Sequence, residues 1–124
     1  MAVTDNFSNR GTSVKVVKDS ALSNTVVTNI LAATGTIKIL RLINGHATTV
    51  NYFKAYDNTA PVSGTTEPDI IIPVAGTDSI PSQIVYAVNG FTFSSGASII
   101  GSATAGKANT AAVATSLTAD IISG

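Results

Sequence analysis

Residues that could carry out a reaction are few in this chain, and they do not cluster in the sequence. His46 is the single histidine in 124 residues, and there is no cysteine. A zinc site needs several His, Cys or carboxylate ligands, and no Cys or Glu lies near His46. No serine stands in the Gly-x-Ser-x-Gly pattern that exposes a hydrolase nucleophile. We therefore expect His46 to be a solvated turn residue, and a hydrolase pocket around it is the alternative left open.

Two carboxylates, Glu67 and Asp69, flank Pro68. Paired carboxylates can hydrolyse glycosides or bind calcium. Here they stand where a loop enters a strand, and Asp57 could join them only if that loop folds back. The spacing favours solvated side chains, and a weak calcium site is the alternative. No metal ligand is assigned.

Phosphate and nucleic-acid motifs are also missing. The segment GSATAGK at residues 101–107 is followed by Ala108, so it lacks the Ser or Thr of a phosphate-binding loop, and its glycines are wrongly spaced. Lys15 and Lys18 form a small basic cluster without interleaved aromatic residues. We predict a protein that is not an enzyme, has no cofactor and does not bind nucleic acid.

The composition favours a protein that packs against others. Charged residues make up 11% of the chain, against about a quarter in a typical domain, and the formal net charge is zero. Thr, Ser and Asn must supply most of the polar surface, which repels partners weakly. A stable extracellular β-protein is the alternative. No apolar stretch is long enough to span a membrane, and the N-terminus does not read as a signal peptide.

Short β-branched runs separated by Gly, Pro and Asn predict an all-β fold of eight or nine short strands. Residues 13–124 are expected to form one β-sandwich domain, jelly-roll-like, after a flexible N-terminal arm at residues 1–12. The Ala-rich end of the chain could also be helical, but its Thr, Val and Ile residues favour a strand. The predicted strands are 12–18, 25–32, 36–43, 48–57, 69–74, 83–88, 91–95, 97–103 and 113–122.

Asn-Gly pairs at residues 44–45 and 89–90 predict two tight hairpins. In the strand at 36–43, alternation puts Ile37 and Ile39 on one face, with Arg41 beside them. Lys38, Leu40 and Leu42 fall on the other face. Both faces carry apolar residues, so one face is expected to form the core and the other to meet a neighbour.

The middle of the chain resembles small virion proteins of tailed bacteriophages. The resemblance spans residues 39–103, about half the chain, and rests on four motifs in a fixed order. They are Lys54-x-Tyr56-Asp57; Pro61 with Gly64, Thr65 and Pro68; Ile72-Pro73-Val74 with Gly76; and Gly-Phe-x-Phe-x-x-Gly-x-Ser-Ile at residues 90–99.

This resemblance implies a structural β-sandwich without catalytic residues. It implies a protein that is made in the host cytoplasm and then assembled into the virion. There it is expected to be a capsid decoration or cement protein that stabilises the head. The expected partners are the major capsid protein or other virion proteins. Homo-oligomers are also expected, with a trimer favoured by the symmetry of capsid sites. A neck or tail component and a carbohydrate-binding β-sandwich module are the alternatives.

The loop after Asp57 is expected to make contacts, because its prolines reduce the entropy lost on ordering. Tyr and Arg dominate interface hot spots, although the tyrosines could equally be ordinary sheet residues. The candidate interface residues are Phe7, Arg10, Tyr52, Tyr56, Pro61, Pro68 and Tyr86.

Overall fold

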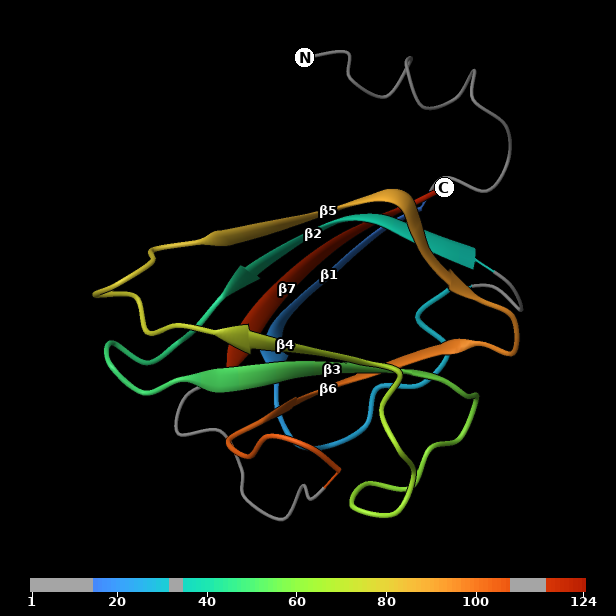
Figure 1. Cartoon of the computed structure of the whole chain (residues 1–124), viewed down its shortest axis with the longest axis horizontal. Coiled ribbons are helices and arrows are strands. Elements are labelled where there is room, and N and C mark those ends of the chain that lie inside the picture. Colours follow the sequence, from blue (N-terminus) through green and yellow to red (C-terminus); the bar gives the residue numbers. More distant parts are fainter. Residues whose placement is uncertain (1–14, 32–34, 108–115) are drawn as a thin grey trace.

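A computed structural model describes residues 15–31, 35–107 and 116–124 (Figure 1). These residues form strands and loops, with no helix among them. The predicted arm at residues 1–12, with Phe7 and Arg10, lies outside the described residues. The strands are β1 (Lys15–Leu22), β2 (Gly35–Ile43), β3 (Asn51–Asp57), β4 (Ile70–Val74), β5 (Gln83–Phe93), β6 (Ala97–Ser102) and β7 (Leu117–Ser123).

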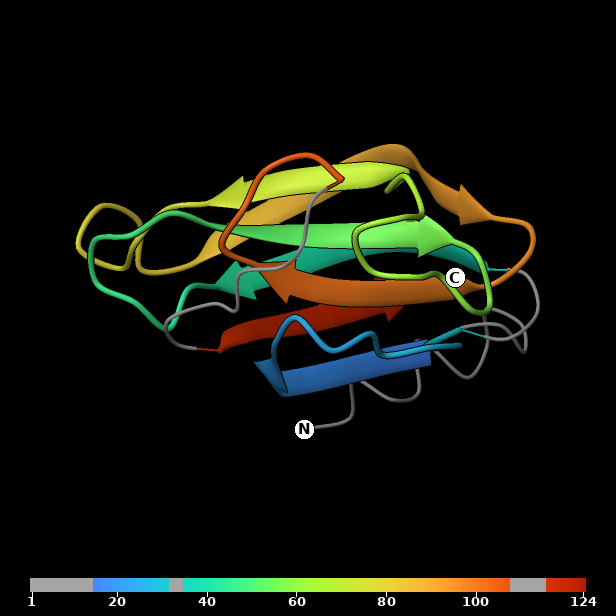
Figure 2. The same cartoon turned by 90° about the horizontal axis from the view of Figure 1, so that it is seen from below.

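The strands form two antiparallel sheets that pack face to face (Figures 1 and 2). One sheet has the order β1-β7-β2-β5 and the other β4-β3-β6. A short bridge at Val27 extends the second sheet beside β6. With that segment counted as a strand, the chain order is that of an eight-stranded jelly roll. The predicted all-β, jelly-roll-like sandwich is confirmed.

Strands predicted over 36–43, 48–57, 69–74 and 97–103 are confirmed, with small shifts at their ends. The end of the chain is a strand rather than a helix from Leu117 on, and its side chains alternate between buried and half-buried. Residues 113–115 of that prediction lie outside the described part of the chain.

Of the strand predicted over 25–32, residue 32 lies outside the described residues, and within 25–31 only Val27 forms a β-bridge. Val27 exchanges two backbone hydrogen bonds of 3.0 Å with Ile99 of β6. Asn29 then adopts a φ of 53°, in the left-handed region, which interrupts an extended strand. Ile30 returns to β6 by donating to the Ala97 carbonyl at 2.9 Å. The segment therefore follows β6 without forming a full ladder.

Both predicted Asn-Gly hairpins are wrong. The strands on either side of Asn44 and Gly45 belong to different sheets, so the pair lies in a connection that crosses the sandwich. Gly90 lies inside the continuous strand β5, with a φ of 78°. There, residues 87–90 stand opposite Lys38 alone, which makes a large bulge.

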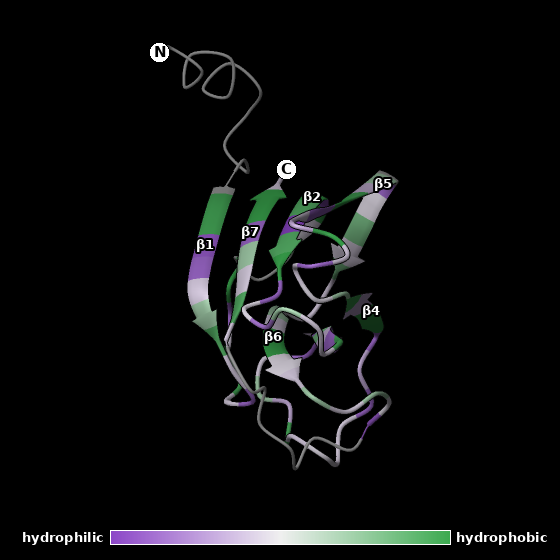
Figure 3. Ribbon diagram, turned by 90° about the vertical axis from the view of Figure 1, so that its left-hand side faces the viewer, coloured by the Kyte–Doolittle hydropathy of each residue, from purple (hydrophilic) through white to green (hydrophobic). Residues whose placement is uncertain are grey.

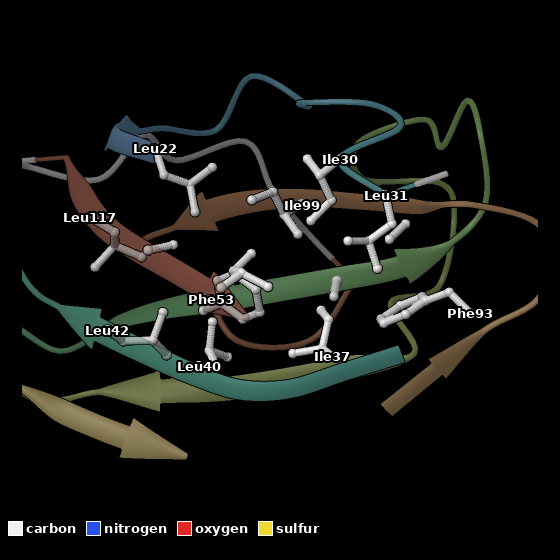
Figure 4. Packing of buried hydrophobic residues seen from close by; sticks show 14 of the residues in the cluster. Leu22, Ile30, Leu31, Ile37, Leu40, Leu42, Phe53, Phe93, Ile99 and Leu117 are labelled. Atoms are coloured by element: carbon white, nitrogen blue, oxygen red, sulfur yellow. The ribbon is translucent and has the colours of Figure 1, made fainter. Parts of the chain in front are cut away.

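A second register shift, against β7, changes which residues of β2 share a face. Ile37 stands opposite Ser123 and Ile39 opposite Ile122, so β2 has one extra residue there and forms a bulge of its own. Ile37 lies in the core with Leu40 and Leu42, whereas Ile39 points outward. The prediction that Ile37 and Ile39 share a face is therefore wrong, because uninterrupted alternation fails at a bulge. Figure 4 shows Phe53 of β3 pointing across the core toward Leu40 of β2.

Candidate functional site

His46 has a structural role in the connection between β2 and β3. Its Nδ1 atom accepts the backbone N–H groups of Thr48 at 3.2 Å and Thr49 at 3.0 Å. The nearby Asn44 side chain is buried and uses its amide fully. It donates to the carbonyls of Thr49 and Val74 and accepts from the Asn51 amide and the His46 N–H. Both side chains are thus engaged in holding the connection between β2 and β3.

The acidic residues hold turns together. The Asp69 carboxylate accepts the Asp57 N–H at 2.7 Å. Glu67 lies 3.8 Å from the Lys107 ammonium, a loose surface pair. Within the described residues, no three His, Cys, Asp or Glu side chains come together as a metal site would require. The calcium alternative therefore gains no support from the geometry.

Asp57 joins the end of β3 to the turn between β5 and β6. Its carboxylate accepts the Ser95 N–H at 2.7 Å, the Ser94 hydroxyl at 3.0 Å and the Gly96 N–H at 3.3 Å. The backbone hydrogen bonds from Ser95 and Ser94 are the largest causes that lower the pKa of Asp57 below its usual 3.8. A carboxylate used in this way is a fixed part of the fold.

Over β3 and β6, the outer face of the three-stranded sheet is covered by the chain itself. Lys54 stands opposite Ile100 and Tyr56 opposite Ser98, and all four are fully buried. The Lys54 ammonium donates to the Gly106 carbonyl, and burial lowers the pKa of Lys54. Figure 2 shows the segment after β6 folding back across this sheet.

In contrast, the described residues leave the outer face of the four-stranded sheet open. A shallow depression of about 320 Å³ lies on it. Figure 3 shows hydrophobic stretches of β1, β7 and β2 side by side. We call this surface the open face; it is formed by Val16, Lys18, Ile39, Arg41, Ile84, Tyr86, Asp120 and Ile122.

The strand registers arrange the open face in two rows that cross all four strands. The apolar row runs Val16, Ile122, Ile39 and Tyr86. The side chains at its two ends are well exposed, Val16 at 52% and Tyr86 at 72%. Large side chains with that exposure, contiguous on one sheet face, are typical of an interaction surface.

The second row is charged and runs Lys18, Asp120 and Arg41, ending in Ile84. Arg41 Nη2 lies 2.8 Å from Asp120 Oδ2, and Arg41 Nε lies 2.9 Å from the same oxygen. The row therefore holds one ion pair and one additional cation. A partner surface with apolar side chains and an acidic group would complement it.

The structure separates the predicted interface residues. Tyr86 lies on the open face, while Tyr52 and Pro68 are half-buried. Tyr56 and Pro61 are buried, so neither presents its side chain to a partner in this structure. Sequence reasoning missed Val16, Ile84 and Ile122, which the alternation within their own strands could have identified.

Comparison with protein families, curated proteins and solved structures finds no match for this chain. Among the residues the structure describes, no helix is long and apolar enough to cross a membrane.

Proposed function

We propose that this protein is a structural component of a tailed-phage virion, a capsid decoration protein that stabilises the head through protein–protein contacts. The observation that carries the proposal is the open face. In the three-stranded sheet, loops cover the outer face over β3 and β6, while the four-stranded sheet presents an apolar row and a short charged row to the outside. The jelly-roll fold and the motif resemblance at residues 39–103 support the same proposal.

The mechanism is burial of the open face against a capsid subunit. A standard specific contact buries roughly 1,600 Å² in total. Covering Val16 and Ile39 removes apolar area from water. The exposed Lys18 attracts an acidic group of the capsid subunit and so orients the two proteins. Repetition of the contact over a shell adds stabilisation at every lattice site. The trimer and the capsid location stay predictions.

The carbohydrate-binding alternative is less well supported by the surface. Sugar-binding modules stack sugar rings on exposed aromatic side chains. Among the described residues, Tyr86 is the single large aromatic that is well exposed. A neck or tail component would use the same open face, so copy number per particle must distinguish it from a decoration protein.

The test uses two valines of similar exposure in different places. Val16 is 52% exposed on the open face, and Val62 is 58% exposed in the loop after Asp57. Val16→Asp should abolish co-sedimentation with capsids that lack the protein, because it places a charge in the apolar row. Val62→Asp should bind as the wild type does. If Val62→Asp abolished binding and Val16→Asp did not, the contact would lie in the loop, and the role of the open face would be overturned.

A further inference from the structure

The edges of the two sheets differ in how they are protected against pairing with another chain. Natural edge strands are guarded by charges, prolines, bulges or covering segments. Pro73 interrupts the short edge strand β4, because proline has no N–H to donate. β6 is covered by the Val27 segment. β1 carries Lys18 and Asp19 at its middle.

β5 lacks most of these protections. It is 11 residues long and pairs with β2 on one side, with no other described strand beyond it (Figure 3). No charged residue occurs anywhere in residues 79–106. The bulge at residues 87–90 protects the second half of the strand. Residues 83–86 pair regularly with β2, and Ala87 begins the bulge. Together residues 83–87 form an uncharged edge that no other described strand covers.

We infer that two copies of this protein pair through residues 83–87 of β5, antiparallel and about a two-fold axis. An antiparallel pair that continues the sheet must place outward residues opposite outward residues. The register centred on Val85 is the one that pairs the whole segment. It sets Val85 opposite its own copy and Ile84 opposite Tyr86 of the second copy.

This pairing has favourable chemistry on the outer face. Ile84 is 53% exposed and Tyr86 72% exposed, so both are available to a neighbour. β-branched and aromatic side chains form stabilising cross-strand pairs, and no like charges meet. The two four-stranded sheets become one, and the two open faces join side by side. The pairing does not depend on a place in the virion.

The test is sedimentation equilibrium of the full chain, without capsids. The wild type should have twice the 12.5 kDa mass of one chain. Ile84→Lys with Tyr86→Lys sets like charges opposite each other in both cross-strand pairs. It should weaken the dimer by about ten- to a hundred-fold. Ile84→Lys with Tyr86→Glu creates two opposite-charge pairs in this register and should restore the dimer.

The matched control is Val16→Lys with Val62→Lys, which adds the same charge at exposed positions away from β5 and should stay dimeric. A monomeric wild type would overturn the pairing. So would the trimer that capsid symmetry favours, because this pairing predicts a two-fold dimer in its place. If the variant with Ile84→Lys and Tyr86→Lys remained dimeric, the pairing would also be overturned. A charge-swapped variant that stays monomeric would overturn the register. The mass of the free protein does not depend on capsid binding. These results therefore test the dimer without testing the proposed function.

Discussion

Arg41 and Asp120 lie directly opposite each other on β2 and β7 and form an ion pair, with 2.8 Å between Arg41 Nη2 and Asp120 Oδ2. Lys18 stands opposite the same aspartate from the other side. Arg41 keeps 49% of its side chain exposed. An ion pair this exposed is weak as a source of stability, because water screens it. Its position in the open face makes it part of the proposed recognition surface.

A double-mutant cycle of Asp120→Asn and Arg41→Met should therefore give a small coupling free energy, about 0.2–1 kcal/mol in urea unfolding. The reason is that both partners retain contact with solvent in the folded state. A coupling above about 2 kcal/mol would mean that the pair is a stabilising element of the fold.

Asn44→Ala should lower the free energy of unfolding by about 3 kcal/mol, because the buried Val74 carbonyl and Asn51 amide lose their partner. Asn89→Ala, at the exposed asparagine of the other Asn-Gly pair, is the matched control and should cost less than about 0.5 kcal/mol. Urea unfolding of both variants measures the difference. Equal costs would show that Asn44 does not act as a hydrogen-bonding centre.

Gly90→Ala should destabilise the protein more than Gly64→Ala. Both glycines have a positive φ, which costs about 1 kcal/mol for alanine. A methyl group at Gly64 meets open space, whereas at Gly90 it would lie 2.0 Å from Thr36 Cγ2. We expect a total cost of about 2–4 kcal/mol at Gly90, measured by thermal or urea unfolding. Similar losses in both variants would contradict the tight bulge.

Asp57→Asn should reduce stability at neutral pH and make the remaining stability less sensitive to acid. The pKa of Asp57 is lowered in the folded state, so its charged form stabilises the fold above the unfolded pKa near 3.8. That contribution is lost as the pH falls through the lower, folded pKa. Urea unfolding between about pH 7 and pH 3 should show the two proteins converging at the acid end.

The control is Asp78→Asn, at an exposed carboxylate that makes no side-chain hydrogen bond with the described residues; it should change the free energy of unfolding little. A constant gap between Asp57→Asn and the wild type over the whole pH range would contradict the role given to the carboxylate.

The sequence predicted the fold class because β-branched alternation and turn residues are local signals. It failed where long-range pairing decides the outcome. Asn44 and Gly45 have the composition of a tight hairpin, but the fold uses Asn44 as a buried hydrogen-bonding side chain between sheets. Gly90 occupies a bulge, and a local pattern cannot distinguish a bulge from a turn.

The surface was predicted less well than the fold. Tyr86 was identified from residue type and lies on the open face, yet Tyr56, chosen for the same reason, is fully buried. Its outward position on β3 is covered by loops, and the sequence contains no direct sign of that cover. The extra residue of β2 at Lys38, seen in its register against β7, likewise decides that Ile39, not Ile37, joins the open face.

The most direct test of the proposed function is co-sedimentation of the purified protein with capsids that lack it, followed by a count of bound copies. A decoration protein should saturate at on the order of hundreds of copies per particle, because its site repeats over the shell. Binding of about a dozen copies or fewer would place the protein at the neck or tail. No binding at all would contradict a structural role on the capsid.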